Sequence, residues 1–336
     1  MNTLGSPASQ DANLKVLYIV GPARAGSTLL GMLLGEINEF LYVGELLTGW
    51  RHPLGEDWLI CGCGKKIQAC DFWIEVLAEG GRLAGGRLES LLENDRRCVG
   101  SRRFPIRRTR ELLRIPDGGD TGNPELDECI AHLGRLLFAV AKTSGAKVIV
   151  DSSKTPGIAA ALHLIPGVSP FFVNLLRDPR ATVASWRYAK TVNKADVRRE
   201  MPIFSARRAA LLWTKFQLGA DLVRKHDRMR SLSVRYEDLM ARPRRHLEAI
   251  TRLVGETEAT LPLVDEKTAR LGVHHTITGN PDRFVQGEVV LRPPTETRKN
   301  LSLIEAIVTR ALTLPLALRH GYVPWMRGER GPSAPG

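Results

Sequence analysis

The first group of residues suited to chemistry is a glycine-bracketed loop with one cation and two hydroxyls. Gly21 and Gly26 keep the spacing of the nucleotide loop G-x-x-x-x-G-K-[ST], in which the lysine reaches the β- and γ-phosphates. Here Ser27 and Thr28 follow the second glycine directly, and the cation, Arg24, lies inside the loop. Such glycine pairs also occur in ordinary strand-to-helix turns. As a binding site, the loop predicts an anion shorter than a triphosphate, held by helix N-terminal amides and a guanidinium.

A second cation and hydroxyl follow a later apolar run. The segment LLRDPRATVASW begins at Leu175, and its arginine, Arg177, comes where the predicted strand ends. Ser185 stands eight residues further on, within a helix expected to begin near Pro179. This pair predicts a second phosphate site, because a guanidinium and a hydroxyl can bind one phosphate together.

Together, the two motifs resemble the cofactor signatures of the sulfotransferase family that uses 3′-phosphoadenosine 5′-phosphosulfate (PAPS). In that family a loop [R/K]-[S/x]-G-[T/S]-T holds the 5′-phosphosulfate, and R-D-P-R-x-x-x-x-S holds the 3′-phosphate. The resemblance implies that PAPS binds, that adenosine 3′,5′-bisphosphate is the product, and that no metal is required. The cofactor contacts that it implies from the two motifs are Arg24, Ala25, Gly26, Ser27, Thr28, Leu29, Arg177 and Ser185.

Two later segments extend the resemblance. Tyr236, in the segment VRYEDL, is similar to a family tyrosine near the adenine, although a tyrosine at a strand end can equally be a core residue. The segment 275–284, HTITGNPDRF, is similar to a late loop that closes over the cofactor in bacterial and carbohydrate-type members. This likeness implies cofactor contacts from Asn280 and Arg283, whereas the Asn-Pro pair alone could form a structural turn.

Sulfuryl transfer needs cations on the bridging oxygens and a base for the acceptor hydroxyl. Arg24 and Lys154 are the candidate cations. Small-molecule cytosolic members commonly show Lys-Thr-His and use that histidine as base, but Pro156 stands there in this chain. Glu45 follows Arg24 by 21 residues in a Gly-Glu context, which resembles tyrosylprotein-type sulfotransferases whose glutamate is the base. Asp151 is the alternative base.

The elements that must position these residues read as an α/β fold. Four short apolar runs predict buried strands, and between them lie helical patterns, one of them with Asn123 as its N-cap. We therefore expect a P-loop-like, three-layer α/β/α fold with a central parallel sheet, in which strand ends bring their polar residues together. The predicted strands are 16–20, 147–151, 170–176 and 231–236, and the predicted helices are 124–143 and 206–229.

The domain organisation follows from the same patterns. Residues 15–325 are expected to form a single sulfotransferase domain, and residues 1–14 and 326–336 are expected to be disordered. The stretch 50–122 breaks the alternation, being rich in glycine, arginine and short helical pieces such as 89–95. We interpret it as a mainly helical insertion that covers the acceptor site.

Three cysteines lie close together at Cys61, Cys63 and Cys70. A closed structural zinc site needs four ligands, and Cys98, Cys129 or His52 would have to complete one, at no recognised spacing. Free thiols are the default expectation in a reducing cytosol, with zinc and a labile disulfide as alternatives.

The net charge of +12 favours anionic partners. The densest arginine cluster, residues 96–110, has a single interleaved aromatic residue, Phe104, whereas nucleic-acid grooves usually contain several stacking rings. We interpret this cluster as a solvated face, with an electrostatic funnel for an acidic acceptor as the alternative. No apolar run is long enough to span a membrane and residues 1–14 lack a signal-peptide pattern, so a cytoplasmic location is expected.

Three other functions compete with sulfuryl transfer. A P-loop kinase would need the missing lysine, although Asp151 could serve as its magnesium ligand. A basic nucleic-acid-binding protein would leave the paired phosphate motifs unexplained. A zinc-knuckle interaction module would bind zinc stoichiometrically. We expect a small-molecule or glycan acceptor and no nucleic acid, and the sequence indicates neither the acceptor's identity nor the oligomeric state.

Overall fold

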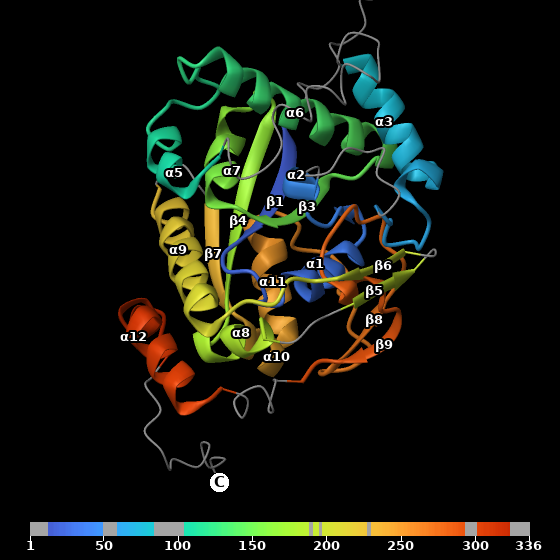
Figure 1. The fold of residues 1–336 in the computed structure, drawn as a ribbon. Helices are drawn as coiled ribbons and strands as arrows, with labels where there is room; N and C mark the ends of the chain where they lie inside the picture. Colours follow the sequence, from blue (N-terminus) through green and yellow to red (C-terminus); the bar gives the residue numbers. More distant parts are fainter. Residues whose placement is uncertain are drawn as a thin grey trace, which may run out of the picture.

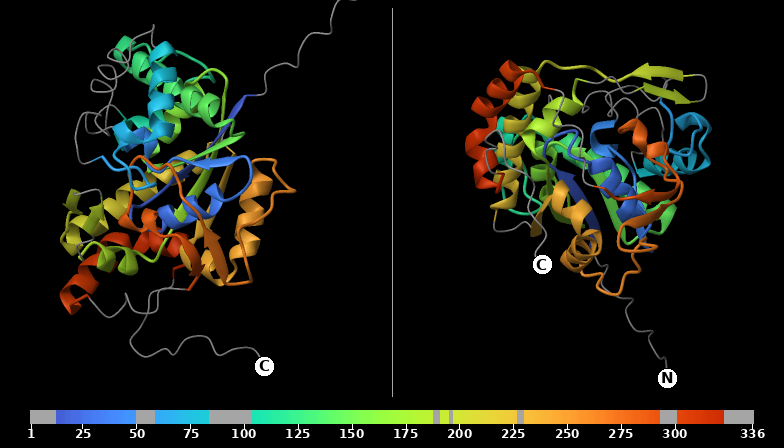
Figure 2. Two further views of the ribbon diagram at one scale, coloured as in Figure 1. Left: turned by 90° about the vertical axis from the view of Figure 1, so that its right-hand side faces the viewer. Right: turned by 90° about the horizontal axis from the view of Figure 1, so that it is seen from below.

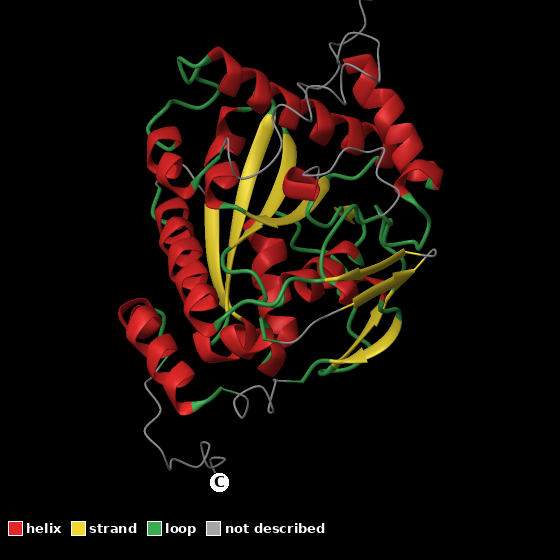
Figure 3. Cartoon of the chain, in the orientation of Figure 1, coloured by secondary structure: helices red, strands yellow, loops and turns green. Residues whose placement is uncertain are grey.

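The computed structural model describes residues 13–49, 59–83, 104–187, 191–194, 197–226, 230–292 and 301–322. A five-stranded parallel sheet in the order β2-β3-β1-β4-β7 lies in the middle of the molecule, with helices around it (Figures 1 and 3). This arrangement confirms the predicted α/β fold with a central parallel sheet. The strands are β1 (Leu14–Val20), β2 (Phe40–Tyr42), β3 (Val148–Lys154), β4 (Val168–Leu176) and β7 (Arg230–Arg235).

Both faces of this sheet are buried. Along β1, Val16 and Tyr18 belong to one hydrophobic cluster and Leu17 and Ile19 to another, because successive side chains of a strand point to opposite faces. The first cluster contains residues of α3, α6, α7 and α9, and the second contains residues of α1, α10 and α11. The three-layer arrangement follows from near-continuous apolar strands covered on both sides.

The helices begin where the sequence supplies caps. The Asn123 side chain accepts a hydrogen bond from the backbone N–H of Leu126, as predicted, and starts α6. The helix predicted over 206–229 ends earlier, at Arg224. The helices of the described residues are α1 (Ser27–Gly35), α2 (Leu46–Gly49), α3 (Asp71–Leu83), α5 (Ile106–Leu112), α6 (Pro124–Ser144), α7 (Pro156–Ala161), α8 (Pro179–Ser185), α9 (Ala206–Arg224), α10 (Tyr236–Ala241), α11 (Pro243–Leu253) and α12 (Leu303–Arg319), with short 3₁₀ turns η1 (Ile67–Ala69), η2 (Leu162–Leu164) and η3 (Pro281–Phe284).

The four predicted strands are confirmed, and the sheet has a fifth. β2 is three residues long and pairs with β3, placing Phe40 opposite Val148. A run this short carries too little periodicity to be predicted as a strand. β3 extends to Lys154, three residues beyond the predicted end, so the polar residues after Val150 are part of the strand.

The remaining elements surround this core. Two antiparallel pairs, β5 (Thr191–Lys194) with β6 (Val197–Glu200) and β8 (Thr268–Leu271) with β9 (Gly287–Val290), lie outside the main sheet. The right-hand view of Figure 2, seen from below, shows α12 beside α9, and the two helices pack together. No helix among the described residues is long and apolar enough to cross a membrane.

The predicted insertion is described in part. Its helices α3 and α5 pack on α6 and on α7 with α9, respectively, so they contact the core of the domain. The short helix predicted over 89–95 and residues 50–58 lie outside the described residues. That this segment covers the acceptor site stays a prediction.

Candidate functional site

The carboxyl ends of all five strands carry residues that the sequence assigned to the site. Arg24 lies in the loop after β1, Glu45 follows β2, and Lys154 ends β3. Arg177 follows β4, and Tyr236 follows β7. Because the strands are parallel, these residues gather at one edge of the sheet, here called the strand-end site.

The loop after β1 has a backbone shape that exposes its amides. Gly21 and Gly26 have φ values of 132° and 96°, and Arg24 also has a positive φ of 68°. A Cβ on Gly26 would lie 2.4 Å from the ring of Tyr236, so only glycine fits there. Gly26 caps α1 without a side-chain hydrogen bond, which leaves the first amides of this helix available to an anion.

Arg24 places a buried positive charge at this edge of the sheet. Its side chain is buried, with 7% exposure, yet none of its three guanidinium nitrogens has a hydrogen-bond partner among the described residues. The guanidinium lies 4.8 Å from the centre of the Trp186 ring. Burial lowers the pKa of Arg24, and the nearby carboxylates of Asp282 and Glu45 raise it. A buried guanidinium without hydrogen-bond acceptors fits an anionic ligand.

Glu45 and Lys154 form an ion pair beside this loop. The Lys154 ammonium donates to Glu45 Oε1 at 2.5 Å and to the carbonyl of Ser152 at 2.7 Å. Lys154 adopts a positive φ of 69°, a costly conformation for a residue with a Cβ. The Glu45 side chain retains 28% exposure, so the pair is accessible from one side. The structure thus brings the candidate base and the second candidate cation together.

Asp151, the alternative base, is fully buried. Its carboxylate accepts hydrogen bonds from the backbone amides of Ser153 at 2.7 Å and Leu47 at 3.0 Å. Burial raises its pKa to about 6 despite these bonds. The Leu47 bond ties α2 to β3, and Glu45 immediately precedes α2. This environment fits a residue that positions the Glu45 segment better than one that meets an acceptor.

Arg177 bridges the first loop and the end of β7. Its guanidinium donates to the carbonyl of Arg24 at 3.1 Å and stacks 5.0 Å from the centre of the Tyr236 ring. Tyr236 is half-buried, lies next to both Gly26 and Arg177, and also packs against the second hydrophobic cluster. Ser185 ends α8 and is also half-buried.

The late loop, residues 274–284, runs alongside the Glu45 segment. The Ile277 amide donates to the carbonyl of Val43 at 3.1 Å, and the Glu45 amide donates to the carbonyl of Thr278 at 3.2 Å. A Cβ on Gly279 would lie 4.0 Å from Glu45 Oε1. The loop that resembles a cofactor lid therefore contacts the strand-end site.

The two residues predicted from this loop also have structural bonds. Asn280 caps η3 by accepting from the Asp282 amide at 3.2 Å. The Arg283 guanidinium is buried and donates to the carbonyls of Thr276 at 3.0 Å and Ile60 at 2.7 Å. These bonds fasten the loop to the segment after residue 58, and contact with a cofactor stays a prediction for both residues.

Two residues at the site were missed from the sequence. Trp186 faces Arg24, and Asp282 acts on its charge. Both residues lie next to predicted contacts in the sequence, because Trp186 follows Ser185 and Asp282 lies between Asn280 and Arg283.

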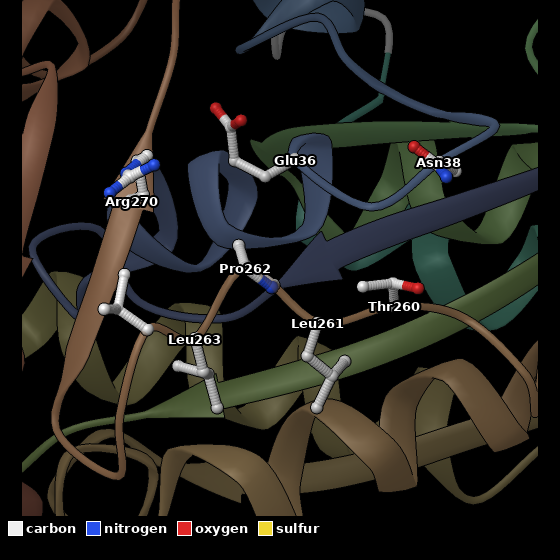
Figure 4. A pocket seen from close by; sticks show the side chains of 8 residues that line it. Glu36, Asn38, Thr260, Leu261, Pro262, Leu263 and Arg270 are labelled. Atoms are coloured by element: carbon white, nitrogen blue, oxygen red, sulfur yellow. The ribbon is translucent and has the colours of Figure 1, made fainter.

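A separate cavity of about 430 Å³ opens at the other end of α1 (Figure 4). It is lined by Glu36, which follows α1, by residues 260–264 and by Arg270 of β8. The nine residues of α1 place it about 13 Å from Gly26 along the helix axis. This cavity is therefore not part of the strand-end site.

The model of the sulfotransferase family matches residues 17–259. The chain belongs to this family. The predicted membership of the sulfotransferase family is thereby confirmed, and the protein is a transferase. No curated protein gives a significant match.

Solved structures of sulfotransferases also resemble it. The sulfotransferase domain of the Synechococcus PCC 7002 olefin synthase is 17% identical, with 94% of this chain and 98% of that chain covered and a TM-score of 0.48. The sulfotransferase domain from the curacin biosynthetic pathway is 15% identical, with coverages of 90% and 97% and a TM-score of 0.44. Sulfotransferase STF9 of Mycobacterium avium is 15% identical, with coverages of 92% and 78% and a TM-score of 0.41.

Proposed function

We propose that this sulfotransferase moves a sulfuryl group from PAPS to a hydroxyl of a carbohydrate, lipid or natural-product acceptor. The observation that carries the proposal is the buried guanidinium of Arg24, which has no hydrogen-bond partner among the described residues and lies in a phosphate loop without the nucleotide lysine. Such a cation is costly to bury unless an anion satisfies it.

Two sets of residues would hold the cofactor. Arg24 and the free amides at the start of α1 would bind the phosphosulfate, with Ser27 and Thr28 adding hydroxyl donors. Arg177 and Ser185 would bind the 3′-phosphate. The half-buried ring of Tyr236 lies between these two sets and offers an apolar surface to the adenine.

When bound, PAPS supplies an activated sulfuryl group whose acceptance by an oxygen leaves adenosine 3′,5′-bisphosphate. In this proposal a carboxylate oxygen of Glu45 takes the proton of the acceptor hydroxyl. The hydroxyl oxygen of the acceptor thereby becomes the nucleophile. Lys154, whose ammonium lies 2.5 Å from Glu45 Oε1, would supply positive charge beside the phosphate that leaves. The exposed side of the Glu45–Lys154 pair is where the acceptor would enter.

Calorimetric titration tests the cofactor assignment. We expect adenosine 3′,5′-bisphosphate to bind without metal and more tightly than ATP with Mg²⁺, because the loop lacks the group that clamps a γ-phosphate. Arg177→Ala should weaken bisphosphate binding roughly 10- to 100-fold, the usual worth of a hydrogen bond to a charged group.

Arg270→Ala is the control, since the Arg270 guanidinium pairs with Glu288 at 2.9 Å on β8, outside the strand-end site. It should bind the bisphosphate like the unaltered protein. A preference for ATP with Mg²⁺ would instead indicate a phosphotransferase. Once cofactor binding is established, labelled PAPS screened against sugars, glycolipids and phenolic natural products identifies the acceptor class.

A further inference from the structure

The three clustered cysteines lie next to a histidine that is 205 residues from Cys70 in sequence. Cys61 Sγ lies 3.6 Å and Cys70 Sγ lies 3.3 Å from His275 Nδ1. Cys70 Sγ is 3.6 Å from Cys61 Sγ and 3.7 Å from Cys63 Sγ. All four atoms lie within 4.8 Å of one another, and we call these residues the Cys–His cluster.

The four separations of 3.3 to 3.7 Å are close to the edges of a metal tetrahedron. With Zn–S bonds of 2.3 Å and a Zn–N bond near 2.05 Å, tetrahedral angles place sulfurs about 3.8 Å apart and sulfur about 3.6 Å from nitrogen. A disulfide would need an S–S distance near 2.05 Å, far shorter than those in the cluster. Cys61, Cys63 and Cys70 are all free thiols.

The backbone is built to bring the thiols together. Residues 60–66 form a tight hairpin in which Ile60 pairs with Lys66 and Gly64 turns with a φ of 90°. Gly62 packs so closely on the late loop that a Cβ would lie 2.3 Å from the carbonyl of His274. Cys70 follows the hairpin in sequence and comes immediately before α3.

The histidine is also held in place. Its ring stacks on Phe72, with ring centres 5.0 Å apart and planes inclined by 26°. The Gly62 amide donates to the carbonyl of Thr276 at 2.9 Å, which joins the hairpin to the residue after His275. Cys61 and Cys70 are buried, and Cys63 and His275 are half-buried.

We propose that Cys61, Cys63, Cys70 and His275 bind one Zn²⁺ ion as a closed structural site. Three thiolates and one imidazole in tetrahedral spacing suit zinc, whereas Mg²⁺ and Ca²⁺ prefer oxygen ligands. With four protein ligands the site keeps no open position for a reacting group. The ion instead clasps the hairpin to the late loop, alongside the Arg283–Ile60 bond, and so steadies the loop that contacts Glu45.

The sequence favours free thiols by default and allows zinc only with a fourth ligand at Cys98, Cys129 or His52, whereas this proposal gives that place to His275. Cys129 is disulfide-bonded, and the other two lie outside the described residues. His275 is 205 residues from Cys70 in sequence, so no local spacing rule could identify it as a candidate ligand.

Metal analysis of tag-free protein tests the site. We expect about one zinc ion per chain after dialysis against a chelator, since a closed site of this kind retains its metal. Cys63→Ser and His275→Gln should lose it under the same dialysis, whereas His246→Gln, a half-buried histidine on α11, should keep it. Equal zinc contents in all four proteins, or no zinc in any, would overturn the proposal.

A measurement on the unaltered protein covers variants that fail to fold. Native mass spectrometry should show the added mass of one zinc less two protons, because a bound Zn²⁺ replaces two protons in an ion of given charge. Exchange of the zinc for cobalt should produce the visible absorption of tetrahedral, thiolate-bound Co²⁺. Finding iron in place of zinc, or a disulfide between two of these cysteines, would contradict the assignment. None of these readouts depends on PAPS or on turnover.

Discussion

The strand-end site and the Cys–His cluster are built by different means. Strands position the first: each of its main residues ends or follows a strand of one parallel sheet, so the fold itself brings them together. Loops position the second, in which a hairpin after residue 58 meets the late loop through backbone hydrogen bonds and four ligand atoms.

The two regions also differ in how their polar groups are satisfied. At the strand-end site a buried guanidinium lacks hydrogen-bond partners among the described residues, and Lys154 has a costly backbone conformation. Charge left unsatisfied by the protein is charge available to a ligand. In the Cys–His cluster the four candidate ligand atoms lie within 4.8 Å of one another, so the proposed ion would have a structural role and no catalytic one. Changes at the first region should therefore affect turnover, and changes at the second should affect local order.

The largest expected effect is on turnover at Glu45. Glu45→Gln should lower kcat by about two to four orders of magnitude, the usual worth of general-base catalysis, because an amide cannot take the acceptor proton. Binding of adenosine 3′,5′-bisphosphate should persist, since the phosphate contacts are unchanged. Steady-state sulfation assays and calorimetry on the same preparation separate the two quantities.

A matched pair on the same strand provides the control. Glu39 precedes β2 and pairs with Lys147 at 2.7 Å, at the opposite end from Glu45. Glu39→Gln removes a similar carboxylate–lysine pair away from the strand-end site and should leave kcat unchanged. If Glu45→Gln retains its turnover, the role of base moves to Asp151 or to another group.

The same contrast explains what the sequence could predict. The loop at Gly21, the motif at Arg177 and the polar residues after Val150 were predictable because each is a local pattern next to an apolar strand, and parallel strands bring such ends together. β2 was too short to show a period. His275 was recognised as part of a family-like loop but not as a ligand, because nothing near it in sequence resembles a metal motif. The proximity of His275 to the cysteines becomes visible only in the folded chain, where hydrogen bonds join the hairpin to the late loop.

A smaller effect is expected from Asp151, which supports the strand-end site from within. Its folded-state pKa of about 6 lies above the ordinary value near 3.8, so its contribution to stability is greatest below about pH 4 and is lost as the pH rises through 6. Relative to Asp151→Asn, the unaltered protein should gain roughly 2.5 kcal/mol of unfolding free energy between pH 7.5 and pH 4. Urea denaturation of both proteins at several pH values measures this difference. Parallel pH profiles for the two would show that Asp151 is not the titrating group inferred here.

The smallest effect on chemistry, and the most local one on structure, should follow removal of zinc. If the ion clasps the hairpin to the late loop, metal-free protein should exchange amide hydrogens faster in residues 59–70 and 274–284. Protection in β1, β3 and β4 should change least, because backbone pairing holds their ladder and the second hydrophobic cluster contains none of the four ligands, whereas Cys61 and Cys70 belong to the first cluster. Bisphosphate affinity should fall by only a few-fold, since Arg24 and Arg177 stay in place at the ends of β1 and β4 and only the late loop becomes more mobile. Hydrogen exchange with mass spectrometry follows both regions in one experiment, on the zinc-bound protein, after the zinc is stripped under conditions harsher than the dialysis described above, and again after zinc is added back. Loss of protection throughout the sheet would show that the two regions fold as one unit, and the contrast between a strand-built and a loop-built region would then fail.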